Sequence, residues 1–254
     1  MSRLLENQIA FITGATSGFG RASAERFARE GARLVLLGRR RERLEQLERA
    51  LGVPVHAIAV DVRNRRAVEE AIAALPADFA AVDVLVNSAG LALGLDPAHR
   101  ASVDDWEQMI DTNCRGLVVC TRALLPRMVE RGRGHVVNLG SVAGTYPYPG
   151  GNVYGATKAF VHQLSQNLRS DLLGSGVRVT VIEPGLAETE FSLVRLGDEA
   201  KAGAVYAGMT PLTADDVAET ILWVVTRPPH VNVNVIELMP TEQAWGPFAV
   251  HRQA

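Results

Sequence analysis

Short apolar runs alternate with longer segments of helical periodicity from one end of the chain to the other. The apolar runs are rich in Val, Ile and Leu and show little alternation between apolar and polar positions. Such runs are typical of parallel strands that helices cover on both faces. On this pattern we predict strands at 8–13, 33–37, 55–60, 82–87, 134–140, 177–183 and 231–238.

Between these runs, apolar residues recur at the spacing of an amphipathic helix. We predict helices at 20–30, 40–51, 65–75, 103–131, 153–173 and 214–226. Regular alternation of strand and helix favours an α/β, doubly wound, Rossmann-type fold. We therefore expect a single parallel sheet of about seven strands with helices on both faces.

The chain shows no internal repeat, low-complexity tract or Pro/Gly-rich linker, and its 254 residues suit one α/β domain. We therefore expect residues 1–254 to form a single domain. The least regular stretch, 187–211, lies between a predicted strand and the last predicted helix. Loops of this length often cover a ligand, so we expect an irregular substrate lid there.

Composition narrows the function classes. Hydrophobic residues make up 47% and charged residues 21% of the chain, and the formal net charge is −2. These values give no sign of a nucleic-acid or anionic-membrane partner. We find no signal-peptide pattern and no apolar run of the roughly 18–20 residues that a membrane span needs. Cys114 and Cys120 have the spacing of neither a zinc site nor a redox pair, so we expect free thiols, no metal and a cytoplasmic location.

A glycine-rich turn, TGATSGFG at 13–20, follows the first predicted strand and leads into the first predicted helix. Glycines allow a tight turn and let backbone N–H groups approach a pyrophosphate, while the helix N-terminus adds partial positive charge. Glycines also make turns that bind nothing, but the position between a strand and a helix favours a dinucleotide. The residues that we expect to contact it are Gly14, Thr16, Ser17, Gly18, Phe19 and Gly20.

The end of the second predicted strand favours NADP over NAD. NAD sites usually carry Asp or Glu about 20 residues after the glycines. Here the strand is followed by Arg39, Arg40 and Arg41, with no acid among them. We expect Arg39 and Arg40 to bind a 2′-phosphate through charge-assisted hydrogen bonds. The alternative is a solvated helix start paired with the glutamates that follow at helical spacing, and this fits Arg41 and Arg43 better.

Polar and small residues follow the third and fourth predicted strands, at the edge where open parallel sheets bind ligands. Asp61 and Val62 follow the third strand, although Asp61 could instead cap the next helix. Asn87, Ala89 and Gly90 end the fourth strand, and small residues there leave room for a ribose or a flat ring. We expect cofactor contacts at these positions.

A tyrosine and a lysine lie four residues apart in the helix predicted at 153–173. Tyr154 and Lys158 therefore share one helix face, downstream of Ser141 at the end of a strand. We expect the Lys158 ammonium, and the charge of an oxidised nicotinamide, to lower the pKa of Tyr154. Tyr154 could then exchange a proton with a substrate oxygen that Ser141 holds. Such a pair is uninformative alone, and gains weight from the glycine turn and Ser141.

Together these motifs resemble those of the short-chain dehydrogenase/reductase family over almost the whole chain. They are TGATSGFG at 13–20, DV at 61–62, NSAG at 87–90, Asn113, Ser141, YGATK at 154–158 and PGLAET at 184–189. The resemblance implies an oxidoreductase with Tyr154 as acid/base and Lys158 as its pKa modulator and ribose ligand. Ser141 is implied to bind the substrate oxygen.

The resemblance assigns further roles. Asn113, otherwise only an odd amide in a buried helix, is implied to break that helix and support a water path to Lys158. Pro184, Gly185 and Thr189 are implied to border the nicotinamide. A homotetramer or homodimer through helices 103–131 and 153–173 is implied as well, with ordinary packing against the sheet as the alternative. The apolar residues of these helices that suggest an interface are Met109, Leu117, Val118, Leu124, Phe160, Leu164 and Leu168.

A narrower resemblance is carried by LGRRRERL at 37–44, GGNVYGATKAF at 150–160, EPGLAETEFSLVR at 183–195, HVNVNVIELMP at 230–240 and VHRQ at 250–253. These segments are similar to the NADP-dependent 3-hydroxy acid (serine/allo-threonine) dehydrogenase branch. Its members interconvert small β-hydroxy acids and the matching semialdehydes or 3-oxo acids. Two departures are Ser88, where the family more often has a second asparagine, and a stretch at 185–190 that is one residue shorter. The first bears on a ribose contact and the second on nicotinamide seating.

A substrate of this kind has little apolar area, so an ionic anchor must orient its carboxylate. The arginine fork can hold both carboxylate oxygens at once. Arg195 is our candidate because it lies in the expected lid, and Arg252 in the tail is the weaker alternative. Arg195 could instead be a solvated charge or pair with Asp198 or Glu199.

Two other functions remain open from the sequence. A 3-oxoacyl carrier-protein reductase shares the family's fold and catalytic residues, but it needs a basic patch that the sequence does not locate. A non-catalytic NADP-binding sensor would be favoured by loss of Tyr154 or Lys158, and both are present.

Overall fold

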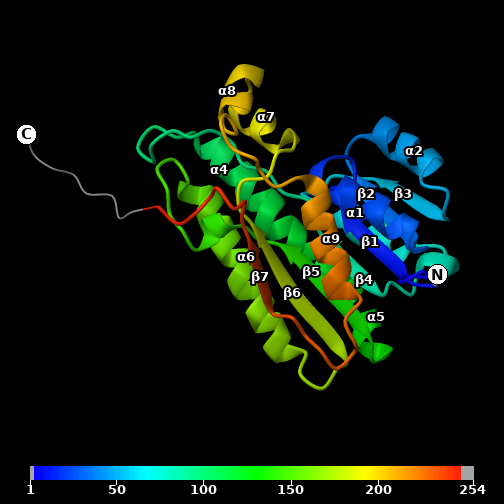
Figure 1. The fold of residues 1–254 in the computed structure, drawn as a ribbon. Coiled ribbons are helices and arrows are strands. Elements are labelled where there is room, and N and C mark those ends of the chain that lie inside the picture. The colour runs from blue at the N-terminus through cyan, green and yellow to red at the C-terminus, as the bar shows by residue number, and fades with distance from the viewer. Residues whose placement is uncertain (1–2, 247–254) are drawn as a thin grey trace, which may run out of the picture.

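The computed structural model describes residues 3–246, and within them the chain forms one seven-stranded parallel sheet (Figure 1). Each strand is bonded to its neighbours in parallel register, for example Phe11 with Val35 and Leu85. This confirms the predicted doubly wound fold. In order across the sheet, the strands are β3 (Val55–Ala59), β2 (Arg33–Gly38), β1 (Ile9–Thr13), β4 (Val84–Asn87), β5 (Gly134–Leu139), β6 (Val177–Pro184) and β7 (Val235–Leu238).

Helices cover both faces of the sheet and bury an apolar core on each side. On one face lie α1 (Gly18–Arg29), α2 (Arg41–Ala50) and α9 (Ala214–Val225). On the other lie α3 (Arg65–Ala73), α5 (Leu117–Glu130) and α6 (Asn152–Asp171). The remaining helical segments are α4 (Val103–Ile110), which packs on α6, α7 (Glu190–Leu196), α8 (Glu199–Ala204) and the short turns 77–79 and 142–144.

Two elements differ from the sequence prediction. The helix expected at 103–131 is interrupted by a π-helical segment, η2 (Asp111–Gly116), between α4 and α5. The last strand begins at Val235 rather than at 231. Before it, the side chain of Asn232 replaces the backbone hydrogen bonds between strands. Its amide forms hydrogen bonds with both the N–H and the carbonyl oxygen of Val179, each at 2.8 Å.

The expected irregular lid at 187–211 is partly helical. It contains α7 and α8, two short helices with polar side chains at their N-terminal caps. Thr189 Oγ1 accepts from the N–H of Phe191 at 3.1 Å, and Asp198 Oδ1 accepts from that of Lys201 at 2.9 Å. Helices this short have little room for an apolar periodicity, so the pattern of the sequence did not reveal them. In Figure 1 both helices stand at one end of the molecule, above the sheet.

In the described part of the chain, no helix combines the length and apolarity that crossing a membrane requires. Residues 3–246 also contain no cluster of three or more His, Cys, Asp or Glu side chains suited to a metal ion. The two cysteines are free thiols, with Cys114 half-buried and Cys120 buried.

A buried histidine in β5 gives the fold a dependence on pH. His135 is 2% exposed, and its Nε2 lies 2.8 Å from Thr180 Oγ1. Burial, aided by the charge of Arg178, lowers the pKa of His135 from 6.5 to about 3. Between pH 6.5 and about 3, His135 therefore binds a proton in the unfolded chain but not in the folded protein. This contribution to the unfolding free energy is present above pH 6.5 and is lost progressively as the pH falls from 6.5 towards 3.

We expect this histidine to lower the unfolding free energy by about 2 kcal/mol between pH 6.5 and pH 5. Urea unfolding of the wild type and of His135→Gln at both pH values measures the contribution. His135→Gln should lose that part of the pH dependence, whereas His230→Gln, at an exposed position, should keep it. The assignment would be contradicted if the unfolding free energy changed equally with pH in the wild type and in His135→Gln.

Candidate functional site

The turn between β1 and α1 admits only glycine at two places. Gly14 has a φ of +67°, and a Cβ there would lie 2.9 Å from the backbone of Ala89. A Cβ on Gly20 would lie 2.5 Å from the carbonyl oxygen of Gly14. Thr13 Oγ1 also accepts from the N–H groups of Ser88 and Ala89, at 3.1 and 3.0 Å, so the turn lies against the end of β4.

The start of α1 is suited to an anion. Ser17 is the N-cap residue and makes no side-chain capping bond, and the first turn of α1 carries no acidic residue. Its first backbone N–H groups therefore keep their capacity to bind phosphate oxygens. Thr189 of the lid lies nearby, since a Cβ on Gly18 would be 3.6 Å from its side chain.

Two arginines gather over this turn. Arg40 donates from Nε and Nη2 to Thr16 Oγ1, at 3.1 and 3.0 Å. Arg43 donates from Nη1 to the carbonyl oxygen of Thr16 at 3.5 Å. Both also bind Glu190, the first residue of α7. Arg43, which the sequence favoured as a solvated helix charge, therefore belongs to the cluster, and its acidic partner is not on its own helix.

Arg39 and Asp61 lie beside this cluster. Arg39 is exposed. Asp61 is half-buried and accepts from Arg63 Nη2 at 2.8 Å and from the N–H of Arg63 at 3.0 Å. Burial opposes ionisation of Asp61, but the bonds to Arg63, with the charge of Arg39, lower its pKa. The helix-cap alternative for Asp61 is wrong, since Asn64 Oδ1 caps α3 through the N–H of Ala67.

The amide of Asn87 is directed into the protein. It donates from Nδ2 to Thr121 Oγ1 and to Asn138 Oδ1, both at 2.9 Å, and the residue is 3% exposed. Within residues 3–246 its Oδ1 has no hydrogen-bond partner. Gly90 has a different role, because a Cβ there would lie 3.3 Å from Asn113 Oδ1. The missing side chain lets the Asn113 amide approach the end of β4.

Asn113 joins three segments. Its Oδ1 accepts from the N–H of Leu91 at 2.9 Å, and its Nδ2 donates to the carbonyl oxygen of Leu91 at 2.8 Å and to Thr157 Oγ1 at 3.0 Å. It sits in the π-helical segment η2 and is 2% exposed. A buried amide with these bonds ties the end of β4 to α6, next to Lys158. Val62 also packs against η2, 2.8 Å from the place of a Cβ on Gly116.

Ser141, Tyr154 and Lys158 come together at the carboxyl end of β5. Lys158 Nζ donates to the carbonyl oxygen of Leu139 at 2.7 Å and lies 5.8 Å from the centroid of the Tyr154 ring. Ser141 Oγ accepts from the N–H of Ala143 at 3.1 Å and donates to the carbonyl oxygen of Pro184 at 3.4 Å. All three side chains are buried.

The pKa of Tyr154 differs from the sequence expectation. Burial raises it to about 12, and this outweighs the lowering effects of a hydrogen bond with Ser141 and of the charge of Arg195. The net effect of the protein's own groups is therefore to raise the pKa, and the expectation of a lowered pKa is wrong for the protein without its cofactor. Burial also lowers the pKa of Lys158 to about 8, opposed by Cys114 and Glu183. At pH 7 the phenol is protonated, which suits a proton donor.

Two residues of α7 cover Tyr154. The ring of Phe191 lies 5.5 Å from it between centroids, and Arg195 Cζ lies 5.4 Å from its centroid. Arg195 donates from Nε to the carbonyl oxygen of Gly94 at 3.1 Å and from Nη1 to the hydroxyl of Tyr148 at 2.8 Å. It forms no ion pair with Asp198 or Glu199 among the described residues, and Arg252 lies outside them.

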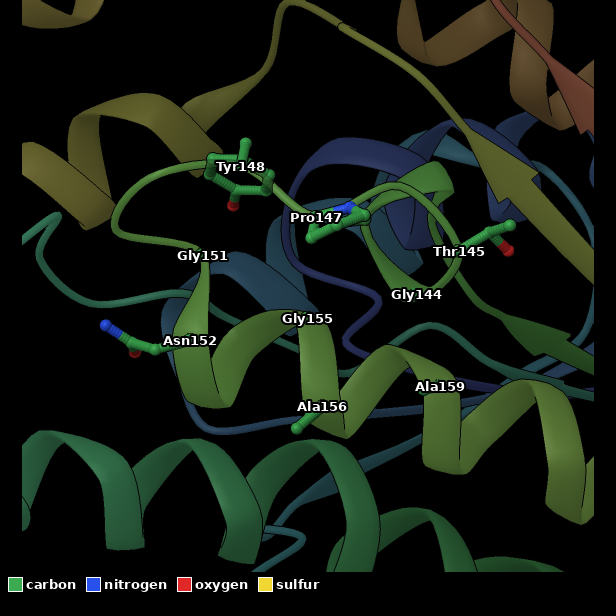
Figure 2. A pocket seen from close by; sticks show the side chains of 10 residues that line it. Gly144, Thr145, Pro147, Tyr148, Gly151, Asn152, Gly155, Ala156 and Ala159 are labelled. Carbon is green, nitrogen blue, oxygen red and sulfur yellow. The ribbon is translucent and has the colours of Figure 1, made fainter. Parts of the chain in front are cut away.

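A pocket of about 360 Å³ adjoins the site without belonging to it (Figure 2). The loop at 145–151 closes it on one side and the N-terminal half of α6 on the other. Its helix residues are Asn152, Gly155, Ala156 and Ala159, on the face of α6 opposite Tyr154 and Lys158. The candidate site is therefore the buried cluster around Tyr154 rather than this pocket.

Sequence reasoning missed Glu190 and Tyr148. Tyr148 lies between Ser141 and Tyr154 in the segment GTYPYPGG, where two tyrosines carry no periodic signal. Glu190 directly follows Thr189, which the sequence already placed beside the cofactor. This neighbourhood was the signal that could have identified Glu190. Gly185 is where expected at the end of β6, where it leaves space for Gln243.

A family model described as short chain dehydrogenase matches residues 8–197 of the chain. The chain is 58% identical to an NADP-dependent 3-hydroxy acid dehydrogenase of Salmonella typhi, over 96% of this chain and 99% of that protein. It is also 58% identical to a sulfoacetaldehyde reductase of Chromohalobacter salexigens, over 96% of this chain and 98% of that one.

The fold has a close structural relative as well. The closed form of a serine dehydrogenase complexed with NADP+ superposes with a TM-score of 0.95 at 56% identity. The match covers 97% of this chain and 100% of that chain.

Proposed function

The chain belongs to the short-chain dehydrogenase family, and from that premise we propose that it is an NADP-dependent oxidoreductase acting on small 3-hydroxy acids. It interconverts a substrate of the serine, allo-threonine or 3-hydroxypropionate type and the matching 3-oxo acid or semialdehyde. The observation that carries the proposal is the guanidinium of Arg195, 5.4 Å from the Tyr154 ring. It provides a cation for the substrate's acid group beside the proposed proton donor.

The residues present fit NADP. The crowded glycines at 14 and 20 leave room only for backbone, and the uncapped start of α1 suits a pyrophosphate. Arg39 and Arg40, together with Arg43, would hold the 2′-phosphate. Asp61, Val62, Asn87, Ala89 and Gly90 would line the adenosine side, and Lys158, Pro184, Gly185 and Thr189 the nicotinamide side. When bound, the cofactor supplies or accepts the hydride.

The proton moves through Tyr154. In reduction, its hydroxyl donates a proton to the substrate's carbonyl oxygen as the alcohol forms, and in oxidation it takes that proton back. Ser141 holds the same oxygen by a hydrogen bond. Lys158, fixed by its bond to Leu139, places a positive charge beside the phenol and favours its ionised form once the proton has left. Asn113 keeps Lys158 beside the end of β4.

We predict that Arg195→Ala raises KM for serine or 3-hydroxypropionate by roughly 10- to 100-fold, the usual range for one charge-assisted contact. KM for an uncharged alcohol or aldehyde of similar size should hardly change. Steady-state kinetics with both substrate types measures the difference. Lys201→Ala, which removes an exposed cation from the same lid, is the matched control. Equal losses for both substrate types would assign Arg195 a structural role.

A second candidate substrate carries a sulfonate in place of the carboxylate. The similarity to a sulfoacetaldehyde reductase favours it, because an arginine that binds a carboxylate can also bind a sulfonate. A screen that follows the absorbance of reduced nicotinamide decides between the two. It should include serine, allo-threonine, 3-hydroxypropionate and isethionate, each with NADP and with NAD, and a 3-oxoacyl thioester with NADPH and with NADH. Turnover of the thioester alone would favour the carrier-protein reductase, and no turnover would favour the sensor.

The proposal includes a homotetramer or homodimer through α5 and α6 and a location in the cytoplasm. The residues that support the interface are fewer than the sequence suggested. Val118 and Phe160 are 39% and 41% exposed. Met109, Leu117 and Leu124, in contrast, are buried within this chain's own core, so ordinary packing accounts for them.

A further inference from the structure

Glu190 is bound by both arginines over the glycine turn. Its Oε2 accepts from Arg40 Nη1 at 3.0 Å, and its Oε1 accepts from Arg43 Nη1 at 2.6 Å. Glu190 is 150 positions from Arg40 and 147 positions from Arg43 in the sequence. Their side chains are 40–44% exposed, so a soluble anion can reach them. The carboxylate thus joins the lid to the segment that follows β2.

The other bonds of the arginines fix them in place. Arg40 is held through Nε and Nη2 by Thr16, and only its Nη1 is directed to Glu190. The bonds to both arginines outweigh the effect of burial and lower the pKa of Glu190, so the carboxylate is ionised at neutral pH. An internal anion therefore already occupies N–H groups of both arginines.

We propose that Glu190 sets cofactor specificity as a built-in competitor of the 2′-phosphate. This inference rests on the proposed function, in which Arg40 and Arg43 hold that phosphate. While Glu190 occupies the Nη1 donors of Arg40 and Arg43, those donors are not free for a phosphate, and a carboxylate beside a phosphate repels it. NADP binding therefore displaces Glu190 from the arginines. NAD, which has a hydroxyl in place of the phosphate, leaves the ion pairs intact.

Displacement of Glu190 also affects the rest of α7, which lies beside the proposed substrate site. Glu190 begins α7, the next residue is Phe191 on the Tyr154 ring, and Arg195 lies four residues, about one turn, further along. The ion pairs hold the first residue of α7, while the bonds of Arg195 hold its end. Binding of the 2′-phosphate therefore releases one attachment of the helix that covers Tyr154, while the bonds of Arg195 and the Ser192–Tyr206 bond remain.

The test is Glu190→Gln, which keeps the shape and removes the charge. Dissociation constants for NADP, NAD and 2′-AMP are measured by titration calorimetry on the full chain. We expect NADP and 2′-AMP to bind roughly three- to thirty-fold more tightly, as for the removal of two exposed ion pairs, and NAD to bind unchanged. Glu199→Gln makes the same charge change on α8 and should leave all three constants as in the wild type.

Unchanged or weaker NADP binding in Glu190→Gln would overturn the inference, and so would an equal gain for NAD. Glu190→Ala repeats the measurement, and thermal melts report whether each variant is folded. Arg40→Ala separates this inference from the proposed function. If Arg40→Ala weakens NADP binding but Glu190→Gln does not strengthen it, only the competitor is excluded. If neither Arg40→Ala nor Arg43→Ala weakens NADP binding, the proposed phosphate site itself fails.

Discussion

Replacing Tyr154 with Phe will lower turnover by roughly 100- to 10,000-fold, the usual contribution of a positioned acid/base. The substitution removes one hydroxyl and keeps the ring, and with it the contacts to Phe191 and Arg195. The fold and the cofactor affinity should therefore be nearly unchanged. The hydroxyl itself has the environment of a proton donor, because burial raises its pKa to about 12.

Steady-state rates with NADP and the best substrate of the screen measure this loss, alongside the NADP dissociation constant. The matched control is Tyr146→Phe, which removes a hydroxyl whose bond to Glu237 is 3.5 Å long at the protein surface. We expect the control to turn over like the wild type. Turnover close to that of the wild type in Tyr154→Phe would exclude the proposed mechanism.

The double substitution of Arg39 and Arg40 by Ala will weaken NADP binding by at least about 100-fold, since each charge-assisted contact contributes roughly 1.5–3 kcal/mol. NAD binding should change little, so the wild-type preference for NADP should be lost. Arg40 is held against Thr16, in the glycine turn. Arg39 is exposed, so we expect the single Arg40→Ala variant to account for most of the effect.

Calorimetric dissociation constants for both cofactors, in the wild type, the two single variants and the double variant, measure these contributions. Arg41→Ala is the control, because this exposed neighbour carries the same charge on the helix start. Equal affinity of the wild type for NADP and NAD would contradict the assignment. A loss that appears only with Arg43→Ala would move the phosphate contact to that residue.

The fold could be predicted from the sequence because buried parallel strands leave continuous apolar runs. All seven predicted strands are present among residues 3–246, with boundaries close to those expected. The exceptions are places where an amide side chain forms hydrogen bonds with the backbone of another segment. Asn232 pairs with Val179 ahead of β7, and Asn113 binds Leu91 within the interrupted helix. A pattern of hydrophobic positions does not indicate such hydrogen bonds between a side chain and the backbone.

The candidate site was predictable where its residues are close in sequence. Tyr154 and Lys158 are four positions apart on one helix, so their shared face follows from helix geometry. The pair of Glu190 with Arg43 joins positions 147 residues apart, and no local pattern signals it. Without the cofactor, the pKa of Tyr154 is raised rather than lowered, because the ring is buried by groups such as Phe191, which only the tertiary structure brings over it.

The sheet order also governs when the site can form during synthesis. β1, the first strand to leave the ribosome, lies between β2 and β4. Its second edge can therefore pair only after residues 84–87 have been synthesised. Tyr154 remains uncovered until α7, nearly forty residues later, has emerged. A nascent chain can thus assemble its nucleotide-binding half early. Arg195, which we propose to hold the acid group of the substrate, leaves the exit tunnel only afterwards.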